Sequence, residues 1–287
     1  VVAGDPVINL ESARNNQNQT SFLYAKDSNG KQIEVLRLHG EENRIWVDFD
    51  KIPKQMKDAF VALEDKRFNS HHGVDWIRTI GVFIKQNDQG GSTITQQLVK
   101  NVTGNNQVTY VRKYNEILSA LNLEKNFNKD EILEAYLNTI YLGQGCYGVE
   151  TAAETYFGKS VDELNVAECA VIASITQMPY SYDPINNPEN NRKRQIYCLD
   201  EMLDQGKITK QEYDDAVAFD LIYTTDDDYV PSKAELERRE NEKNAKASSE
   251  FQSFYVDYVI DDVIARLQSD LGYSYNEARD AIYGGGL

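Results

Sequence analysis

The spacing of apolar residues predicts that most of this chain is helical. From residue 51 to residue 223, apolar side chains recur three or four positions apart, which places them on one face of a helix. Met56, Phe60 and Leu63 follow this spacing, and Ile132 to Tyr141 form a wider apolar face that we expect to be buried centrally. The pattern therefore predicts a mainly α-helical domain over 51–223.

The N-terminal part follows a different pattern. Residues 1–20 are polar and rich in Asn and Gln, which is typical of a weakly ordered tether. Phe22–Tyr24 and Ile33–Leu38 flank the turn signal DSNG and predict a β-hairpin. The sequence IWVDF over 45–49 alternates and predicts a further short strand. We therefore expect a small β segment over 21–50.

Two segments follow the helical domain. Residues 224–250 are highly charged and lack an apolar face, so we interpret them as a solvated linker. Residues 251–287 recover helical periodicity and end in three glycines before Leu287. The expected order is thus tether, β segment, helical domain, linker and a helical C-terminal segment.

Composition narrows the classes of function. The net charge of −16 leaves no basic excess to replace counterions on phosphates, which argues against nonspecific nucleic-acid binding. No stretch reaches the roughly 18 apolar residues that a membrane span needs. Cys146, Cys169 and Cys198 are too few and too widely spaced for a disulfide framework or a zinc site. We expect them to be buried free thiols.

The segment ALEDKRFNSHHG over 62–73 carries the first candidate for catalysis. Glu64 follows Phe60 by four positions, so it projects beside the apolar face of its helix. Partial desolvation favours proton uptake by a carboxylate, which suits a general base or acid. The alternative is a helix-end carboxylate bound to a backbone amide or a nearby cation, and this segment alone does not decide between them.

The segment GGSTITQQLVKN over 90–101 is a candidate anion site. Ser92 or Thr93 can cap a helix on which Ile94 and Leu98 share one side, and the opposite side is polar. A helix N-terminus with hydroxyls and a lysine suits a phosphate, although the glycines do not have P-loop spacing.

Two further helices carry residues with more than one interpretation. Arg112 and Lys113 can meet Glu116 on one face, either as a surface ion pair of a few tenths of a kcal/mol or as part of a binding site. The preceding residues 102–111 are predicted as a mobile loop. The apolar side chains between Trp76 and Ile84 indicate either core or a surface that dips into a membrane interface.

Five sequence blocks stand in a fixed order over about residues 45–208. They are EDKRFNSHHGVD (64–75), GGSTITQQLVKN (90–101), RKYNE (112–116), KDEILEAYLNTIYLG (129–143) and YGVETAAETYFGKSVDELNVAECAVIA (147–173). Together they resemble the peptidoglycan glycosyltransferase family, the polymerase module of class A penicillin-binding proteins and of monofunctional transglycosylases. The second block is especially specific.

The resemblance implies a lysozyme-like, mainly helical fold with two lobes and a long cleft. It implies lipid II as substrate, a disaccharide-pentapeptide on undecaprenyl pyrophosphate, with the growing glycan as donor and lipid II as acceptor. Glu64 matches the family's general base, which takes the proton of the acceptor's GlcNAc 4-hydroxyl as that oxygen attacks the donor's anomeric carbon. The configuration inverts and the lipid pyrophosphate leaves.

The resemblance also implies roles for other residues. Glu116 matches the family's second glutamate, which could orient cations, bind a divalent metal (Mg²⁺ or Mn²⁺) or contact the donor sugar. Asp65, Phe68 and His71 are expected to shape the site. The expected substrate-binding residues are Ser92, Thr93, Gln96, Gln97, Lys100, Arg112 and Lys113.

The chain departs from the family pattern in two places. Many members carry an arginine before the RK block, where Val108 and its neighbours stand here, which puts that phosphate contact in doubt. The late Gly-x-Pro-x-x-Pro segment reads SITQMP over 174–179, so one proline is kept.

The resemblance further implies a place of action and partners. Lipid II is presented at the outer face of the bacterial cytoplasmic membrane, so we expect a single-pass transmembrane anchor before Val1. The expected partners are lipid II, the nascent glycan strand, the membrane surface and other cell-wall synthesis or division proteins, with no nucleic acid. Residues 251–287 resemble the connector to a transpeptidase domain, which this sequence lacks.

Two other functions are weighed against polymerisation. A lysozyme-like peptidoglycan hydrolase could use Glu64 and Glu116 as two carboxylates flanking a water. A non-catalytic wall-binding module could keep the same motifs. The basic residues around Glu116 favour a pyrophosphate donor and therefore synthesis, and the presence of both glutamates argues against a scaffold.

Overall fold

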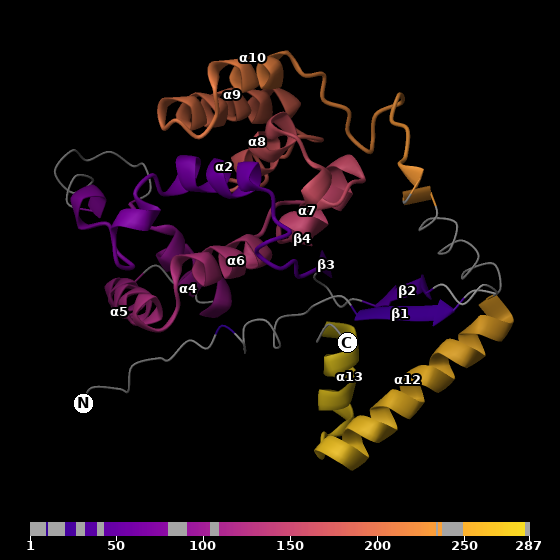
Figure 1. The fold of residues 1–287 in the computed structure, drawn as a ribbon. Helices are drawn as coiled ribbons and strands as arrows, with labels where there is room; N and C mark the ends of the chain where they lie inside the picture. Colours follow the sequence, from indigo (N-terminus) through magenta and orange to yellow (C-terminus); the bar gives the residue numbers. More distant parts are fainter. Residues whose placement is uncertain are drawn as a thin grey trace.

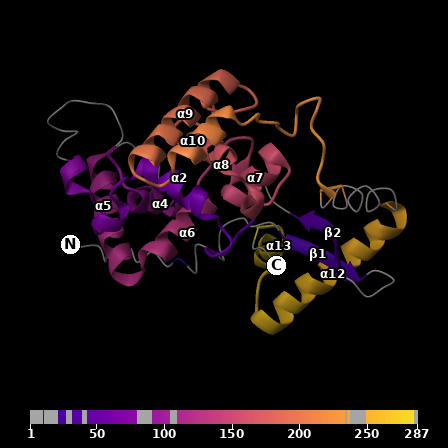
Figure 2. The same cartoon turned by 45° about the horizontal axis from the view of Figure 1, so that its top comes forward.

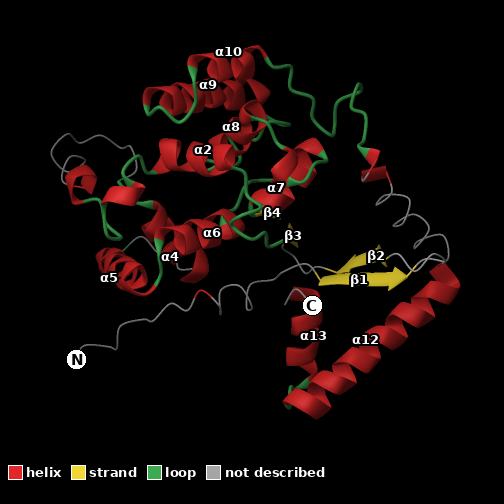
Figure 3. Cartoon of the chain, in the orientation of Figure 1, coloured by secondary structure: helices red, strands yellow, loops and turns green. Residues whose placement is uncertain are grey.

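The protein is mainly helical, as the apolar spacing predicted (Figures 1 and 3). The structure is a computed structural model that describes residue 10 and residues 21–26, 32–38, 43–79, 91–103, 109–233, 235–236 and 249–284. The α-helices of the main body are α2 (Lys54–Glu64), α4 (Ile94–Thr103), α5 (Tyr110–Asn126), α6 (Lys129–Thr139), α7 (Val149–Phe157), α8 (Val166–Ser174), α9 (Pro188–Asp204) and α10 (Lys210–Ala218).

The core forms where the predicted apolar faces meet. α2 packs against α8 and α9, and α4 packs against α5 and α6, so two groups of helices lie side by side (Figures 1 and 2). Phe60 of α2, Leu98 of α4 and Tyr136 of α6 are fully buried. α8 is buried over nearly its whole length, as its sequence VAECAVIAS predicts. This packing fixes the ends of α2, α4 and α8 relative to one another.

Helix caps explain where α5 and α6 begin. Asn128 and Glu131 form a reciprocal capping box at the start of α6. Thr109 caps α5 by accepting a hydrogen bond from the Arg112 amide, so α5 begins at Tyr110. The predicted loop over 102–111 is therefore too long, because α4 continues to Thr103 and Thr109 starts the next helix. Residues 104–108, including Val108, lie outside the described residues.

The strand predicted over 45–49 does not form. A two-residue strand, β3 (Asn43–Arg44), instead pairs in parallel with β4 (Cys146–Tyr147). The following backbone is satisfied by side chains: the Val47 amide donates to Asn138 Oδ1 at 2.8 Å, and the Phe49 amide donates to Glu134 Oε2 at 3.0 Å. The alternating residues 45–49 therefore pack against α6, and side chains of α6 take the place of a neighbouring strand as hydrogen-bond partners.

The helical turn at 76–79 begins at Asp75, whose Oδ1 accepts from the Arg78 amide at 3.0 Å. Trp76 and Ile77 are 53% and 72% exposed, so the interpretation of these two residues as core is wrong. The other apolar residues of that segment, between 80 and 84, lie outside the described residues.

A separate group of elements lies at the opposite end of the molecule from α5 (Figure 2). β1 (Ser21–Lys26) and β2 (Gln32–Leu38) pair antiparallel and contact α13 (Tyr275–Gly284). α13 packs on α12 (Ser249–Leu271) through a small apolar cluster that includes Ile264 and Ile282. Among the described residues, no helix combines the length and apolarity needed to cross a bilayer.

Candidate active site

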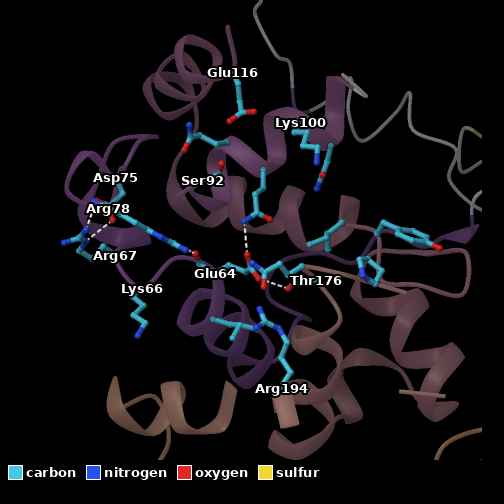
Figure 4. Close-up of a pocket in the computed structure, with 18 of the residues that line it drawn as sticks. Glu64, Lys66, Arg67, Asp75, Arg78, Ser92, Lys100, Glu116, Thr176 and Arg194 are labelled. Carbon is cyan, nitrogen blue, oxygen red and sulfur yellow. Dashed lines mark hydrogen bonds and ion pairs between the residues drawn. The ribbon is translucent and has the colours of Figure 1, made fainter. Parts of the chain in front are cut away.

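A cleft of about 840 Å³ lies between the two groups of helices (Figure 4). Glu64, the last residue of α2, lines it from one side, and Glu116 of α5 lines it from the other. The turn after α8 contributes Thr176, and α9 contributes Arg194. Residues far apart in the sequence therefore meet at one concave surface, the usual geometry of a catalytic site.

Two neutral donors hold the Glu64 carboxylate. The Thr176 hydroxyl donates to Oε1 at 2.6 Å, and the Gln97 side-chain amide donates to Oε2 at 2.9 Å (Figure 4). Arg78 donates to the Glu64 backbone carbonyl rather than to its side chain. Among the described residues, the partners that orient the carboxylate into the cleft are therefore neutral side chains, not a backbone amide or a cation.

Tyr136 fixes the direction of the Gln97 amide. The Tyr136 hydroxyl donates to Gln97 Oε1 at 3.0 Å, which turns the amide nitrogen toward Glu64. Burial raises the pKa of Tyr136 well above its ordinary value, and the nearby charges of Glu64 and Asp65 add to this effect. Tyr136 therefore remains a protonated donor at any physiological pH.

The three residues expected to shape the site connect α2 to α4. Asp65 Oδ2 accepts from the Ile94 amide at 3.0 Å and lies 2.9 Å from His71 Nε2. Phe68 is buried and meets the His71 ring edge-on, with centroids 6.2 Å apart. Their contacts hold the segment after Glu64 against the first turn of α4. The three residues do not line the cleft themselves; they position the residues that do.

The start of α4 differs from the expected anion site. Thr93 is fully buried, and its hydroxyl donates to the Gly73 carbonyl at 2.6 Å. Thr93 and Gln96 also form a capping box: Thr93 Oγ1 accepts from the Gln96 amide, and Gln96 Oε1 accepts from the Thr93 amide at 3.0 Å. With Asp65 on the Ile94 amide, the N-terminal amides of α4 are largely occupied. Anion contacts therefore have to come from side chains.

Those side chains gather around Glu116. Arg112 and Lys113 both pair with its carboxylate, and Lys113 Nζ also donates to Ser92 Oγ at 2.8 Å. Lys100 lines the same part of the cleft and is exposed. Glu116 itself is only 6% exposed, so two cations pair with one buried anion, and Lys100 adds a further positive charge to the cleft. The excess positive charge suits a phosphate or pyrophosphate.

The same contacts do not fit a metal ion at Glu116. Both of its carboxylate oxygens accept from cations, and a divalent metal needs several oxygen ligands free to coordinate it. Within the described part of the chain, no cluster of three or more His, Cys, Asp or Glu side chains could hold a metal.

Sequence reasoning missed several residues at the Glu64 end of the cleft. Arg67 pairs with Asp75 through two hydrogen bonds of 2.9 and 2.7 Å. Burial alone would raise the pKa of Asp75, but hydrogen bonds from the Arg78 amide and from Arg67 outweigh it and lower the value. The DKR run and the spacing from Asp75 to Arg78 carried this signal. Thr176 lies in SITQMP over 174–179, which departs from the family's Gly-x-Pro-x-x-Pro pattern but gave no indication of a contact with Glu64.

Comparisons with known proteins agree on one family. The family described as Transglycosylase matches residues 29–203. Penicillin-binding protein 1A of Neisseria flavescens is 43% identical over 206 residues, which cover 70% of this chain and 25% of that protein. A putative transglycosylase of Cupriavidus necator is 44% identical over 176 residues, covering 60% of this chain and 76% of that protein.

The chain spans about a quarter of the penicillin-binding proteins that it matches. One of these, penicillin-binding protein 1F of Bacillus subtilis, is 43% identical over 65% of this chain. A crystal structure of penicillin-binding protein 1A from Haemophilus influenzae superposes with a TM-score of 0.43 and 28% identity, over 79% of this chain and 26% of that one.

Proposed function

Because this chain belongs to the transglycosylase family, we propose that it is a peptidoglycan glycosyltransferase that polymerises lipid II into glycan strands. The observation that carries the proposal is the cleft itself. A carboxylate oriented by neutral donors, Glu64, faces it at one end, and a cluster of cations around Glu116 faces it at the other. A base and an anion site in one cleft are what this transfer requires.

Glu64 is the general base of the proposed reaction. Its carboxylate takes the proton of the GlcNAc 4-hydroxyl on lipid II as that oxygen attacks the anomeric carbon of the growing chain. The bond from that carbon to the pyrophosphate oxygen breaks, and the configuration inverts. The two hydrogen bonds to Glu64 keep its carboxylate aimed at the acceptor, which lowers the cost of orienting it during the reaction.

The cations stabilise the leaving group. Negative charge develops on the pyrophosphate as its bond to the sugar breaks. Lys100 and Arg112 line the cleft and provide positive charge there, and Lys113 lies beside it, bound to Ser92 and Glu116. Glu116 holds Arg112 and Lys113 in place, so we assign it the role of orienting cations. Ser92 anchors Lys113 from the other side.

A hydrolase has less support than a polymerase. Hydrolysis by inversion needs two carboxylates that flank a water, one acting as acid and one as base. Both carboxylate oxygens of Glu116 accept hydrogen bonds from Arg112 and Lys113, so neither is free to hold a water or to meet a leaving sugar oxygen. A wall-binding module has no use for an oriented base.

We further propose that the protein acts at the outer face of the bacterial cytoplasmic membrane. Trp76 and Ile77 are exposed apolar side chains beside Asp75 and Arg78, which line the cleft. Trp and Ile at a surface suit insertion into a membrane interface, where the lipid chain of the substrate resides. We also propose a transmembrane anchor before Val1 and other wall-synthesis proteins as partners. In this proposal residues 1–20 are a tether, 224–250 a linker and 251–287 a connector.

The test is polymerisation of purified lipid II in detergent by the wild type, Glu64→Gln and Glu189→Gln. Glu189 is an exposed carboxylate on α9 and does not line the cleft, so its variant controls for the loss of one charge. We expect polymer from the wild type and Glu189→Gln and none from Glu64→Gln. Polymer from all three proteins would show that Glu64 is not the base.

A further inference from the structure

Thr176 reaches Glu64 from a distant part of the sequence. It lies in the turn after α8, and its hydroxyl donates to Glu64 Oε1 at 2.6 Å (Figure 4). The structure assigns Thr176 as a positioning residue that keeps the Glu64 carboxylate in its proton-accepting orientation. The inference rests on the proposed function, because it assumes that Glu64 is the base of the transfer.

The local geometry directs the Thr176 hydroxyl at Glu64. The hydroxyl carries one proton and has two acceptors within reach, Glu64 Oε1 at 2.6 Å and the Ala173 carbonyl at 3.1 Å. A hydrogen bond to an ionised acceptor is shorter and stronger than one to a neutral carbonyl, so the proton lies toward Glu64 while that residue is ionised. The β-branched side chain is stiff at χ1, and Thr176 follows a buried helix, so little entropy is lost in holding this contact.

The second acceptor allows Thr176 to serve both protonation states of Glu64. Once Glu64 has taken the proton from the sugar hydroxyl, the Thr176 proton can turn to the Ala173 carbonyl, and Thr176 Oγ1 can accept from protonated Glu64. Gln97 cannot make this change, because Tyr136 fixes its amide with the nitrogen toward Glu64. Thr176 neither gains nor loses a proton over the cycle; it only redirects its own.

The family pattern does not imply this contact. In the Gly-x-Pro-x-x-Pro pattern, Thr176 occupies the position of the first proline. Proline has no side-chain donor, so a chain with proline at this position could not make the hydrogen bond. We therefore infer that Thr176 adds a third point of support for Glu64, beside Gln97 and the Arg78 contact to the backbone.

Three variants separate the hydroxyl from the rest of the side chain. Thr176→Val keeps the shape and removes the hydroxyl, and Thr176→Ser keeps the hydroxyl and removes the methyl group. Thr103→Val is the matched control: Thr103 ends α4, is exposed, and its hydroxyl donates to the Val99 carbonyl at 2.8 Å. Thermal unfolding of each variant confirms that it is folded before its kinetics are compared.

We expect Thr176→Val to lower kcat for lipid II polymerisation about ten-fold, with a small change in KM, because a hydrogen bond to a charged group is lost. Thr176→Ser should restore most of the activity, and Thr103→Val should match the wild type. Equal losses in Thr176→Val and Thr176→Ser would assign the effect to packing of the methyl group and overturn the inference. Wild-type kinetics in Thr176→Val would also overturn it.

The pH profile of kcat/KM gives a readout that a packing defect would not change. The hydrogen bond that Thr176 donates to the ionised carboxylate is stronger than the one it accepts from the protonated form, so loss of the hydroxyl should move the acid limb to higher pH. An unmoved acid limb in Thr176→Val would contradict the inference. The other charged groups near the cleft are the same in every variant; they are Asp65, Lys66, Arg67, Asp75, Arg78, Lys100, Arg112, Lys113, Glu116 and Arg194.

The wild type and Glu64→Gln separate failure of this inference from failure of the proposed function. A wild type that makes no polymer would remove the proposed function and this inference with it. An active wild type with an inactive Glu64→Gln and an unaffected Thr176→Val would leave the proposed function standing and refute only the role of Thr176.

Discussion

Gly73 offers the sharpest structural prediction, because two separate costs act on any larger side chain there. Its φ of +87° lies in the left-handed region, where a side chain costs about 1–2 kcal/mol. A Cβ at this position would also lie 2.6 Å from the Ala120 carbonyl oxygen on the backbone of α5. A buried helix backbone yields little, so we add about 1–3 kcal/mol for overpacking.

The variant Gly73→Ala should therefore lose about 2–5 kcal/mol of unfolding free energy. For a domain of this size that lowers Tm by about 10 °C. The measurement is thermal unfolding followed by circular dichroism. The polymerisation rate should also fall at temperatures where the variant is still folded. The reason is that the Gly73 carbonyl accepts a hydrogen bond from Thr93, which positions the start of α4 next to the cleft.

Gly206→Ala is the matched control. Gly206 has a φ of +66°, and a Cβ there would meet no atom within 4 Å. This variant has the conformational cost without the clash, so its Tm should fall by only about 5 °C. Equal losses in the two variants would refute the reasoning, since the contact with Ala120 would then contribute nothing.

Three further predictions concern stability and reactivity. Burial raises the pKa of the Cys146 thiol from 9.0 to about 11, and all three cysteines are buried as predicted. None should therefore react with Ellman's reagent at pH 8 in the folded protein, and all should react in denaturant. Rapid labelling of the folded protein would contradict this. Asn128→Ala removes the capping box of α6 and should cost about 1 kcal/mol in thermal unfolding, whereas an unchanged Tm would show that the cap is dispensable. The pKa of Asp75 lies below its ordinary 3.8, so the ionised carboxylate stabilises the fold above that pH, and this stabilisation is lost as the pH falls through the folded-state value. The difference in Tm between the wild type and Asp75→Asn should therefore shrink below pH 3.8. A difference that does not change with pH would refute this prediction.

Local sequence patterns predicted the helical domain well, because helix periodicity and caps act over a few residues. The apolar spacing through Phe60 and Tyr136 identified buried helix faces, and Asn128 marked the start of α6. The five blocks identified the family. The same local rules failed over 45–49, where the backbone groups are satisfied by Asn138 and Glu134 from far along the chain.

The site depended more strongly on tertiary contacts. Glu64, Lys100, Arg112 and Glu116 line one cleft, and their roles in it stay predictions. Thr93 was expected to contact substrate, but its capping box and its hydrogen bond to Gly73 keep it fully buried, and it does not line the cleft. Thr176 had no local signal, since its contact with Glu64 joins the turn after α8 to the end of α2 over a sequence separation of 112 residues.

The central claim is that this cleft joins sugars rather than cutting them. The most direct measurement is product analysis after incubation with lipid II, with preformed peptidoglycan as a parallel substrate. The account predicts β-linked glycan strands, one undecaprenyl pyrophosphate released for each new bond, and no fragments from peptidoglycan. Soluble fragments from peptidoglycan, without polymer from lipid II, would contradict it and make the protein a hydrolase.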